Sequence, residues 1–335
     1  MTTSPADTGV ALDIAPVGAR THWEVGGPPV AGAIEVRARA GVIAYEPADM
    51  TITVGAGTSF DELDRVLAEQ GQQCALDPRS RAATVGGILA CGLSGLRRLR
   101  HGPIRDHVLE VRFETGDGRL VKGGGPTVKN VTGYDLPRLF VGSLGTIGVL
   151  HQATLRCRPR PVRSQWFTGV DTARAFRPAA RLWDGEREAV LLEGVDVDVQ
   201  AESRDLVALA GSPAFPDGAH RGRISVAPGA VRACAAALTR ASSESASAPS
   251  KLRWCAELGV GTIHVAADDA GALARARSVA HAHDGWMLRE AGGSSDDDGY
   301  CCPLPNAALM RRVKDAFDPD GRLNRGRLPL GAVLA

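Results

Sequence analysis

Short apolar runs separated by glycine, proline and other turn residues dominate the first 160 residues. Apolar side chains recur at helical spacing over residues 60–67, with Ser59 before them and Gly71 after them. This pattern predicts an amphipathic helix that Ser59 caps and Gly71 ends. The other apolar runs predict short strands, two of which form a hairpin around residues 116–118. The predicted strands are residues 11–15, 34–37, 42–45, 51–54, 107–113, 118–122 and 147–156.

Pro159 and Pro161 mark a change in the pattern, and we predict a domain boundary there. Strand-like and helix-like segments alternate after them, which is typical of a small α+β domain. The predicted segments are strands 188–199 and 261–266, helices 228–240, 269–283 and 307–317, and loops 241–250 and 292–299. The organisation is therefore a first domain at 1–160, a small α+β domain at 161–300, and a C-terminal helix and tail at 301–335 that return to the first domain.

The chain has 335 residues, of which 44% are hydrophobic and 23% charged, and this is typical of a soluble protein with about two domains. Its net charge of +1 gives no general electrostatic basis for binding nucleic acid. No apolar stretch approaches the ~20 residues of a membrane helix, and the first residues lack the basic and apolar segments of a secretory signal. We therefore predict a cytoplasmic protein without a transmembrane segment.

Seven cysteines are scattered along the chain, an odd number with no Cys-x-x-Cys pair. This spacing indicates neither a disulfide framework nor a zinc or iron–sulfur site, so we predict no metal. The adjacent Cys301 and Cys302 permit two interpretations, a redox switch or an incidental pair. The incidental pair is favoured because adjacent cysteines form a disulfide only with strain.

Glycine is the unusual component of the sequence, with 40 residues that cluster mainly in the first half. Thr84 precedes Gly86 and Gly87, and hydroxyl groups and glycine recur together at 92–95. Such segments let backbone N–H groups point at an anion, and their number suits a pyrophosphate. Neither Gly-x-Gly-x-x-Gly after a first strand nor a P-loop is present, so a Rossmann or ATPase fold is not favoured.

A second interpretation is that these glycines only form turns in a compact sheet. For one Gly-Gly pair that interpretation is favoured. Residues 142–148 repeat the pattern with three glycines in seven residues directly before a predicted strand. For the whole set we therefore favour a ligand-binding site.

Four segments together resemble the FAD-binding domain of the vanillyl-alcohol oxidase family, which has the PCMH-type fold. They are residues 83–87 (ATVGG), 92–106, 129–136 (KNVTGYDL) and 142–148 (GSLGTIG). Within that family the sequence is most similar to the FAD-binding subunits of glycolate oxidases. Residues 45–49, 55–58, 69–72 and 317–324 agree with those subunits as well. The resemblance covers residues 16–160 and returns at 303–328.

The resemblance implies an α+β fold, with a two-subdomain PCMH-type FAD-binding domain and a small α+β, ferredoxin-like cap domain. It implies FAD as the cofactor, held in extended form between the two subdomains. The first loop reads Gly18-Ala19-Arg20 where relatives often carry consecutive glycines, so Arg20 would replace backbone donors with a charge. The residues implied at the cofactor are Pro16, Val17, Gly18, Ala19, Arg20, Thr21, Thr84, Val85, Gly86, Gly87, Gly92, Leu93, Ser94, Gly95, Gly102, Arg105, Val108, Gly142, Gly145, Thr146, Gly148, Val149 and Asn324.

The second half of the chain is poor in candidate catalytic groups, because no His-x-x-x-His or His-Gly-Glu cluster follows residue 160. His264 lies on a predicted strand and is either a base that faces the flavin or a structural histidine, and the second is favoured. Lys129 and Tyr134 are preferred for the surroundings of the flavin ring, although their motif also fits a fixed turn. A carboxylate substrate favours nearby arginine. The candidates are Arg97, Arg98 and Arg100, which equally suit a solvated loop or a partner surface.

The function that these observations favour is an FAD-binding subunit of a glycolate-oxidase-like complex. Such a subunit would oxidise a small 2-hydroxy acid, glycolate or similar, and pass electrons to a partner. The implied partners are a larger flavoprotein subunit and an iron–sulfur subunit, through which the complex would lie at the inner membrane. Two alternatives stay open. One is an assembly or electron-transfer subunit with weak or no independent catalysis, and the other is an NAD(P)H-dependent flavin reductase of the same fold.

Overall fold

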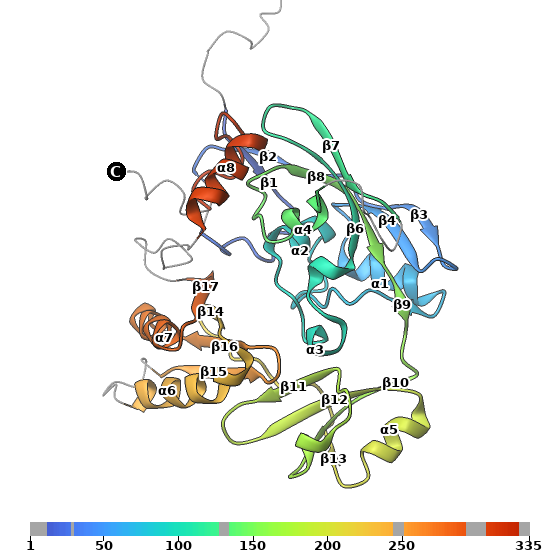
Figure 1. The fold of residues 1–335 in the computed structure, drawn as a ribbon, viewed down its shortest axis with the longest axis vertical. Coiled ribbons are helices and arrows are strands. Elements are labelled where there is room, and N and C mark those ends of the chain that lie inside the picture. The colour runs from blue at the N-terminus through green and yellow to red at the C-terminus, as the bar shows by residue number, and fades with distance from the viewer. Residues whose placement is uncertain (1–11, 28–29, 127–133, 244–250, 293–305, 328–335) are drawn as a thin grey trace, which may run out of the picture.

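The computed structural model describes residues 12–27, 30–126, 134–243, 251–292 and 306–327. Two antiparallel sheets organise the protein into two bodies, one above the other in Figure 1. The first sheet has the strand order β3-β4-β8-β6-β7. The second has the order β13-β10-β12-β11-β15-β16-β14-β17. The α+β class is therefore confirmed.

The five-stranded sheet and four short helices form the first body. Its strands are β3 (Val42–Glu46), β4 (Thr51–Gly55), β6 (Val108–Glu114), β7 (Leu120–Gly124) and β8 (Val149–Arg156). Its helices are α1 (Phe60–Ala68), α2 (Val85–Cys91), α3 (Arg98–His101) and α4 (Leu136–Phe140), with the 3-10 turn η1 (Ile104–His107). The predicted cap of α1 is confirmed, because Ser59 Oγ accepts a hydrogen bond from Glu62 N at 3.1 Å.

Two small sheets join distant segments to the first body. β1 (Ile14–Pro16) pairs with β2 (Ile34–Val36) in parallel, and β5 (Gln72–Gln73) pairs with β9 (Arg158–Pro159) in antiparallel fashion. After α8 (Ala307–Phe317), Leu323 forms a bridge with Ile14. The last part of the chain that the structure describes therefore lies beside the first strand.

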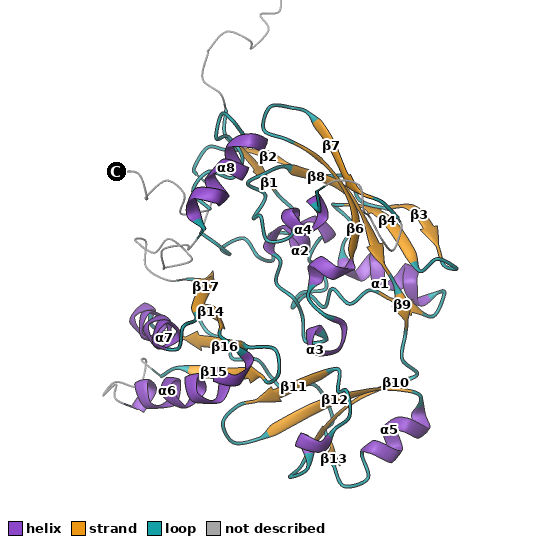
Figure 2. Ribbon diagram, in the orientation of Figure 1, coloured by secondary structure: helices purple, strands orange, loops and turns teal. Residues whose placement is uncertain are grey.

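The eight-stranded sheet forms the second body, and α6 (Val231–Ser243) and α7 (Ala270–Ala282) cover one face of part of it (Figure 2). Its strands are β10 (Arg163–Thr168), β11 (Ala180–Trp183), β12 (Glu188–Gly194), β13 (Val207–Ala208), β14 (His220–Ser225), β15 (Arg253–Glu257), β16 (Thr262–Ala267) and β17 (Trp286–Ala291). The remaining elements are α5 (Asp196–Glu202), η2 (Thr172–Arg174) and η3 (Pro228–Ala230). The succession β14-α6-β15-β16-α7-β17, with the spatial order β15-β16-β14-β17, is the ferredoxin-like arrangement. Strands β10 to β13 extend this unit.

The other face of the eight-stranded sheet is charged and yet buried against the first body. Arg223, Glu257, His264 and Glu290 are each less than 10% exposed. Arg223 Nη2 donates to the carbonyl of Ser94 in the first body at 2.7 Å. An apolar contact among Val25, Leu144 and Leu288 joins the same two bodies. The boundary between the bodies is therefore a mixed interface of ion pairs and apolar packing.

Three predictions of secondary structure are corrected. The predicted strand 188–199 divides into β12, which ends at Gly194, and α5, which begins at Asp196. The predicted loops of 84–102 contain α2 and α3. The second domain contains more strands than predicted, because strands such as β17 are buried along nearly their whole length and show no clear alternation. Residues 301 and 302, and nearly all of the predicted loop 292–299, lie outside the described residues.

His107 is fully buried in the first body, and burial together with the charge of Arg158 lowers its pKa to about 4. In the unfolded chain the pKa is near the ordinary value of 6.5. Between these values the unfolded state binds a proton and the folded state does not, so the free energy of unfolding should fall as the pH drops from about 6.5 to about 4. Denaturant titrations across this range test it. His107→Gln should flatten the dependence, whereas the exposed control His281→Gln should not, and equal slopes would contradict the assignment.

No helix of the described parts is long and apolar enough to cross a membrane. Within the same parts, no group of three or more His, Cys, Asp or Glu side chains is placed to hold a metal ion.

Candidate cofactor site

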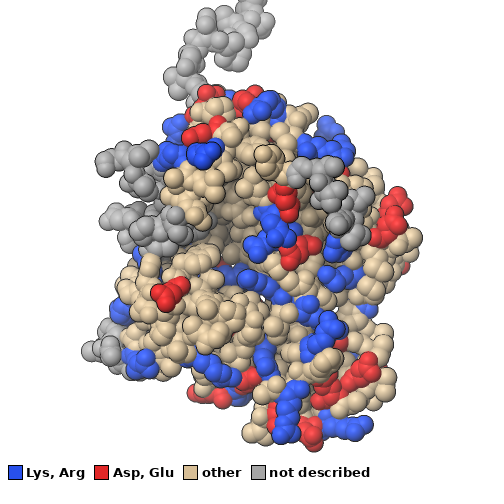
Figure 3. All heavy atoms as spheres, viewed as in Figure 1, with Lys and Arg blue, Asp and Glu red and all other residues tan. Residues whose placement is uncertain are grey.

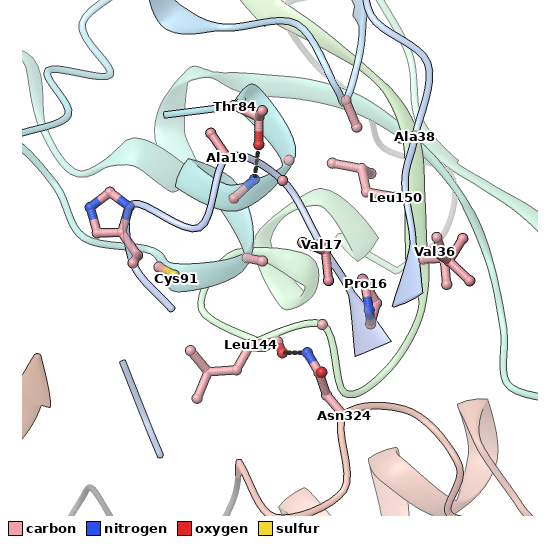
Figure 4. A pocket seen from close by; sticks show the side chains of 18 of the residues that line it. Pro16, Val17, Ala19, Val36, Ala38, Thr84, Cys91, Leu144, Leu150 and Asn324 are labelled. Atoms are coloured by element: carbon pink, nitrogen blue, oxygen red, sulfur yellow. Dashed lines mark hydrogen bonds between the residues drawn. The ribbon is translucent and has the colours of Figure 1, made fainter. Parts of the chain in front are cut away.

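A cavity in the first body lies where the glycine-rich segments meet, and we call it the glycine-rich cavity. Its volume is about 780 Å³ with the space open to solvent included. The end of β1 with the following residues 17–23, the start of α2 and residues 144–150 form most of its wall, and Asn324 and Arg327 complete it (Figure 4). The cavity thus joins parts of the chain that are about 300 residues apart in the sequence.

The glycine-rich cavity brings together many of the predicted cofactor residues. Those that line it are Pro16, Val17, Gly18, Ala19, Arg20, Thr21, Thr84, Gly86, Gly87, Gly145, Gly148, Val149 and Asn324. Those that do not line it are Val85, Gly92, Leu93, Ser94, Gly95, Gly102, Arg105, Val108, Gly142 and Thr146. Several of the second group have local structural roles. Gly92 ends α2 at φ +65°, and Ser94 Oγ accepts a hydrogen bond from Ile104 N at 3.1 Å.

The loop after β1 offers backbone donors. Within the described parts of the chain, the N–H groups of residues 18–22 donate to no protein group, whereas Val17 N donates to Val36 O at 2.9 Å. A run of unpaired N–H groups in a cavity wall suits an anion such as a pyrophosphate. The loop therefore fits FAD at this point.

The start of α2 leaves room for the loop after β1 but offers no free backbone N–H groups to a ligand. The N–H groups of Val85 and Gly86 donate to carbonyl groups at 2.8 Å, and that of Gly87 donates to Thr84 Oγ1 at 3.2 Å. A Cβ atom on Gly18 would lie 2.1 Å from Thr84 Oγ1. The expectation that this glycine segment directs its backbone donors at an anion is therefore wrong for these three groups, because each already has a protein acceptor.

Asn324 connects the C-terminal tail to the loop before β8. Its Nδ2 donates to Leu144 O at 2.6 Å, and its backbone N donates to Ile14 O at 2.8 Å. Its Oδ1 is buried and has no hydrogen-bond partner in the described structure. A buried acceptor without a partner costs about 1–3 kcal/mol, so a ligand that brings an N–H or O–H group would stabilise this site. Gly145 leaves room for the amide, since a Cβ atom there would lie 2.9 Å from Asn324 Nδ2.

Trp23 lies between two arginines at the edge of the cavity. The guanidinium carbon atoms of Arg20 and Arg327 are 4.8 and 5.0 Å from its ring centroid. Arg20 also pairs with Glu35. The charge of Arg20 is therefore balanced by a carboxylate. Arg20 does not replace the backbone donors of the loop, because the unpaired N–H groups of residues 18–22 are also present. Arg327 donates to Trp23 O at 2.9 Å, and burial lowers its pKa.

His22 lines the glycine-rich cavity near the second body. Burial lowers the pKa of its imidazole, the charge of Glu290 opposes that shift, and the charge of Arg79 adds to it. The imidazole is therefore neutral at pH 7 and can accept a proton. Arg79, in the loop before α2, places Nη1 3.0 Å from Glu290 Oε2 on β17 and so connects the two bodies next to His22.

His264 is held in a buried network behind this ion pair. Arg79 Nη2 lies 2.5 Å from His264 Nδ1, and His264 Nε2 lies 2.6 Å from Glu257 Oε1. Because a guanidinium group only donates, Nδ1 accepts, and the imidazole proton is on Nε2 and is donated to Glu257. Burial lowers the pKa of His264 as well. His264 does not line the glycine-rich cavity, and its lone pair is occupied.

The other predicted catalytic and substrate residues also lie elsewhere. Tyr134 is 90% exposed, and Lys129 is outside the described residues. Arg97 Nη1 lies 2.7 Å from Asp77, and its Nη2 lies 2.7 Å from Glu193. None of Arg97, Arg98 and Arg100 lines the cavity.

Several lining residues carried no clear signal in the sequence. They are His22, Trp23, Val36, Ala38, Ala56, Gly57, Ala90, Cys91, Phe140 and Leu150. His22 and Trp23 directly follow the predicted first loop, so extending that loop by two residues would have included them. The apolar members look like ordinary core residues in the sequence, and their place in the wall depends on how the chain folds.

Residues 10–124 match the family model described as FAD binding domain, and residues 304–328 match the one described as FAD linked oxidases, C-terminal domain. The chain therefore carries an FAD-binding domain, and FAD is its cofactor. The C-terminal match includes Asn324 and Arg327 of the cavity wall.

Among curated proteins, the chain is similar to glycolate oxidase subunit GlcE of Escherichia coli (strain K12). The two are 42% identical over 138 residues, which are 40% of this chain and 39% of that subunit. A D-lactate dehydrogenase of Archaeoglobus fulgidus is 40% identical over 106 residues, which are 32% of this chain and 24% of that enzyme. The similar segments thus span less than half the length of these relatives.

Among solved structures, an alkyldihydroxyacetonephosphate synthase has a similar fold, with a TM-score of 0.66 at 14% sequence identity. The match covers 93% of this chain and 71% of that one. The similarity extends over both bodies of the protein, and at this level of identity it concerns the fold alone.

Proposed function

We propose that this chain is an FAD-dependent subunit that oxidises a small 2-hydroxy acid, such as glycolate, and passes the electrons to partner subunits. The observation that carries the proposal is the glycine-rich cavity, whose wall includes unpaired N–H groups, the unpaired Asn324 Oδ1 and a neutral His22. The names of the relatives support the substrate class, since they include glycolate oxidase subunits and D-lactate dehydrogenases. A larger flavoprotein and an iron–sulfur subunit are the proposed partners.

The residues of the cavity would have separate roles in cofactor binding and in catalysis. The N–H groups of residues 18–22 would hold the pyrophosphate, and Asn324 Oδ1 would accept a hydrogen bond from the cofactor. Bound FAD supplies an acceptor for the hydride on the α-carbon of the substrate. His22 Nε2 would accept the proton of the substrate hydroxyl group, so that loss of a hydride and a proton leaves the 2-oxo acid.

We also propose that the chain consists of three parts: the FAD-binding domain at residues 1–160, the α+β domain at 161–300, and the C-terminal helix and tail at 301–335.

A second candidate is a subunit that binds FAD but does not oxidise substrate without its partners. The positions of two of the catalytic residues predicted from the sequence, His264 and Tyr134, favour this candidate. His264 Nδ1 is occupied by Arg79, and Tyr134 is exposed away from the cavity. In this case His22 would have no catalytic role.

Anaerobic mixing of the FAD-loaded chain with glycolate or D-lactate distinguishes the two candidates. We expect loss of the oxidised flavin absorbance, with a rate that His22→Gln lowers at least about 100-fold while FAD stays bound. The control His281→Gln, on the exposed side of α7, should keep the rate. Reduction only in the presence of the partner subunits would favour the second candidate, and reduction by NADPH but not by hydroxy acids would contradict both.

A further inference from the structure

A second cavity lies between the two bodies, away from the glycine-rich cavity, and three arginines line it. Its volume is about 640 Å³ with the open space included, and it is lined by Leu99, Arg100, Arg177, Pro178, Arg181, Leu258 and Gly259. We call it the arginine cavity. Arg100 comes from α3 of the first body, whereas Arg177 and Arg181 come from the segment before β11 and from β11 itself. Figure 3 shows Lys and Arg side chains along the boundary between the bodies.

The positive charge of the arginine cavity is only partly compensated. Arg181 lies 3.2 Å from Glu188, but the same carboxylate also pairs with Arg232 at 2.8 Å. Within the described residues, Arg100 and Arg177 have no carboxylate within ion-pair distance. Arg100 Nη1 donates to the backbone carbonyl of Glu193 at 2.6 Å, which leaves its other N–H groups for a ligand.

Two local observations indicate that this arrangement is specific. Arg177 has φ +47°, a left-handed backbone conformation that is uncommon for a residue other than glycine. Gly259 lies against Leu99, because a Cβ atom there would be 2.9 Å from Leu99 Cδ1. The cavity thus has an apolar side where the bodies touch and a cationic side. Like charges around a common space repel one another, and an anion between them would remove that repulsion.

We propose that the arginine cavity is a binding site for a small oxyanion, a molecule with a phosphate or carboxylate group, and that it is separate from the FAD and substrate site. Guanidinium groups recognise both oxyanions with paired N–H donors. Because the arginines come from both bodies, the bound anion joins α3 to β11 and stabilises the boundary. The proposal does not depend on the reaction at the flavin.

Thermal melting of the full chain tests this site, with inorganic phosphate or oxalate titrated at constant ionic strength and saturating FAD. We expect a saturable rise of the melting temperature, and the more tightly bound of the two anions identifies the preferred group. The double variant Arg100→Gln/Arg177→Gln should raise the apparent dissociation constant at least about tenfold, while its FAD affinity stays unchanged.

Arg174→Gln is the matched control, because Arg174 lies three residues before Arg177 at the end of η2, is exposed and does not line the cavity. It should bind the anions as the unmodified chain does. The proposal is overturned if neither anion gives a saturable rise, or if the double variant retains the same response, since binding would then occur elsewhere.

Discussion

Replacement of Gly18 by alanine should weaken FAD binding about 10- to 100-fold. The new Cβ atom would lie 2.1 Å from Thr84 Oγ1, so the loop of residues 18–22 must move away from α2. Such an overpacked contact costs about 1–3 kcal/mol, and the displaced loop would no longer direct its N–H groups at the pyrophosphate. Quenching of FAD fluorescence during titration measures the affinity.

Two further variants test whether the effect of Gly18→Ala comes from its contact with Thr84. Gly211→Ala is the control, because a Cβ atom at Gly211 meets no other atom within 4 Å. The double variant Gly18→Ala/Thr84→Ala should recover part of the affinity, since it removes the hydroxyl group that the new methyl group meets. Unchanged affinity in Gly18→Ala would show that this loop does not hold the cofactor.

Replacement of Lys314 by methionine should lower the free energy of unfolding by about 3–5 kcal/mol, because it leaves a buried carboxylate without its counter-charge. Lys314 Nζ pairs with Asp318 and donates to the carbonyl groups of Thr146 and Leu323 at 2.7 and 2.9 Å. These contacts join α8 to the loop before β8 and to the C-terminal tail. The Asp318 side chain is fully buried.

Denaturant unfolding measures the Lys314 effect, with Arg312→Met on the exposed side of α8 as the control. That control should change the free energy of unfolding by less than about 0.5 kcal/mol. The double variant Lys314→Met/Asp318→Asn should recover part of the loss, because the buried charge is then absent. A loss in Arg312→Met equal to that in Lys314→Met would contradict the role of the buried pair.

Local signals in the sequence predicted the elements that depend on neighbouring residues. The cap at Ser59 and the hairpin of β6 and β7 are examples, since a few adjacent residues determine them. Helix α2 was not predicted because glycine disfavours helices. It forms in this protein because Thr84 caps it and its residues Ile88 and Leu89 are buried in the core of the first body.

Only the part of the candidate site that is formed by one continuous segment could be predicted from the sequence. Residues 16–21 lie together in the sequence, and all of them line the cavity. The contacts between the bodies were not predictable, because they join residues far apart in the chain. Arg97 pairs with Glu193, which is 96 positions away in the sequence. Arg79 contacts Glu290 and His264, which lie on strands whose register cannot be derived from the sequence. The burial of charged side chains at the boundary between the bodies was therefore not predicted.

The absorption spectrum of the purified chain after reconstitution with FAD and removal of the unbound cofactor tests the central claim most directly. We predict the bands of oxidised flavin with one FAD per chain, and their loss in Gly18→Ala at the same FAD concentration. A chain that stays colourless after reconstitution, with no flavin detected by mass spectrometry, would contradict the assignment of the glycine-rich cavity as the FAD site.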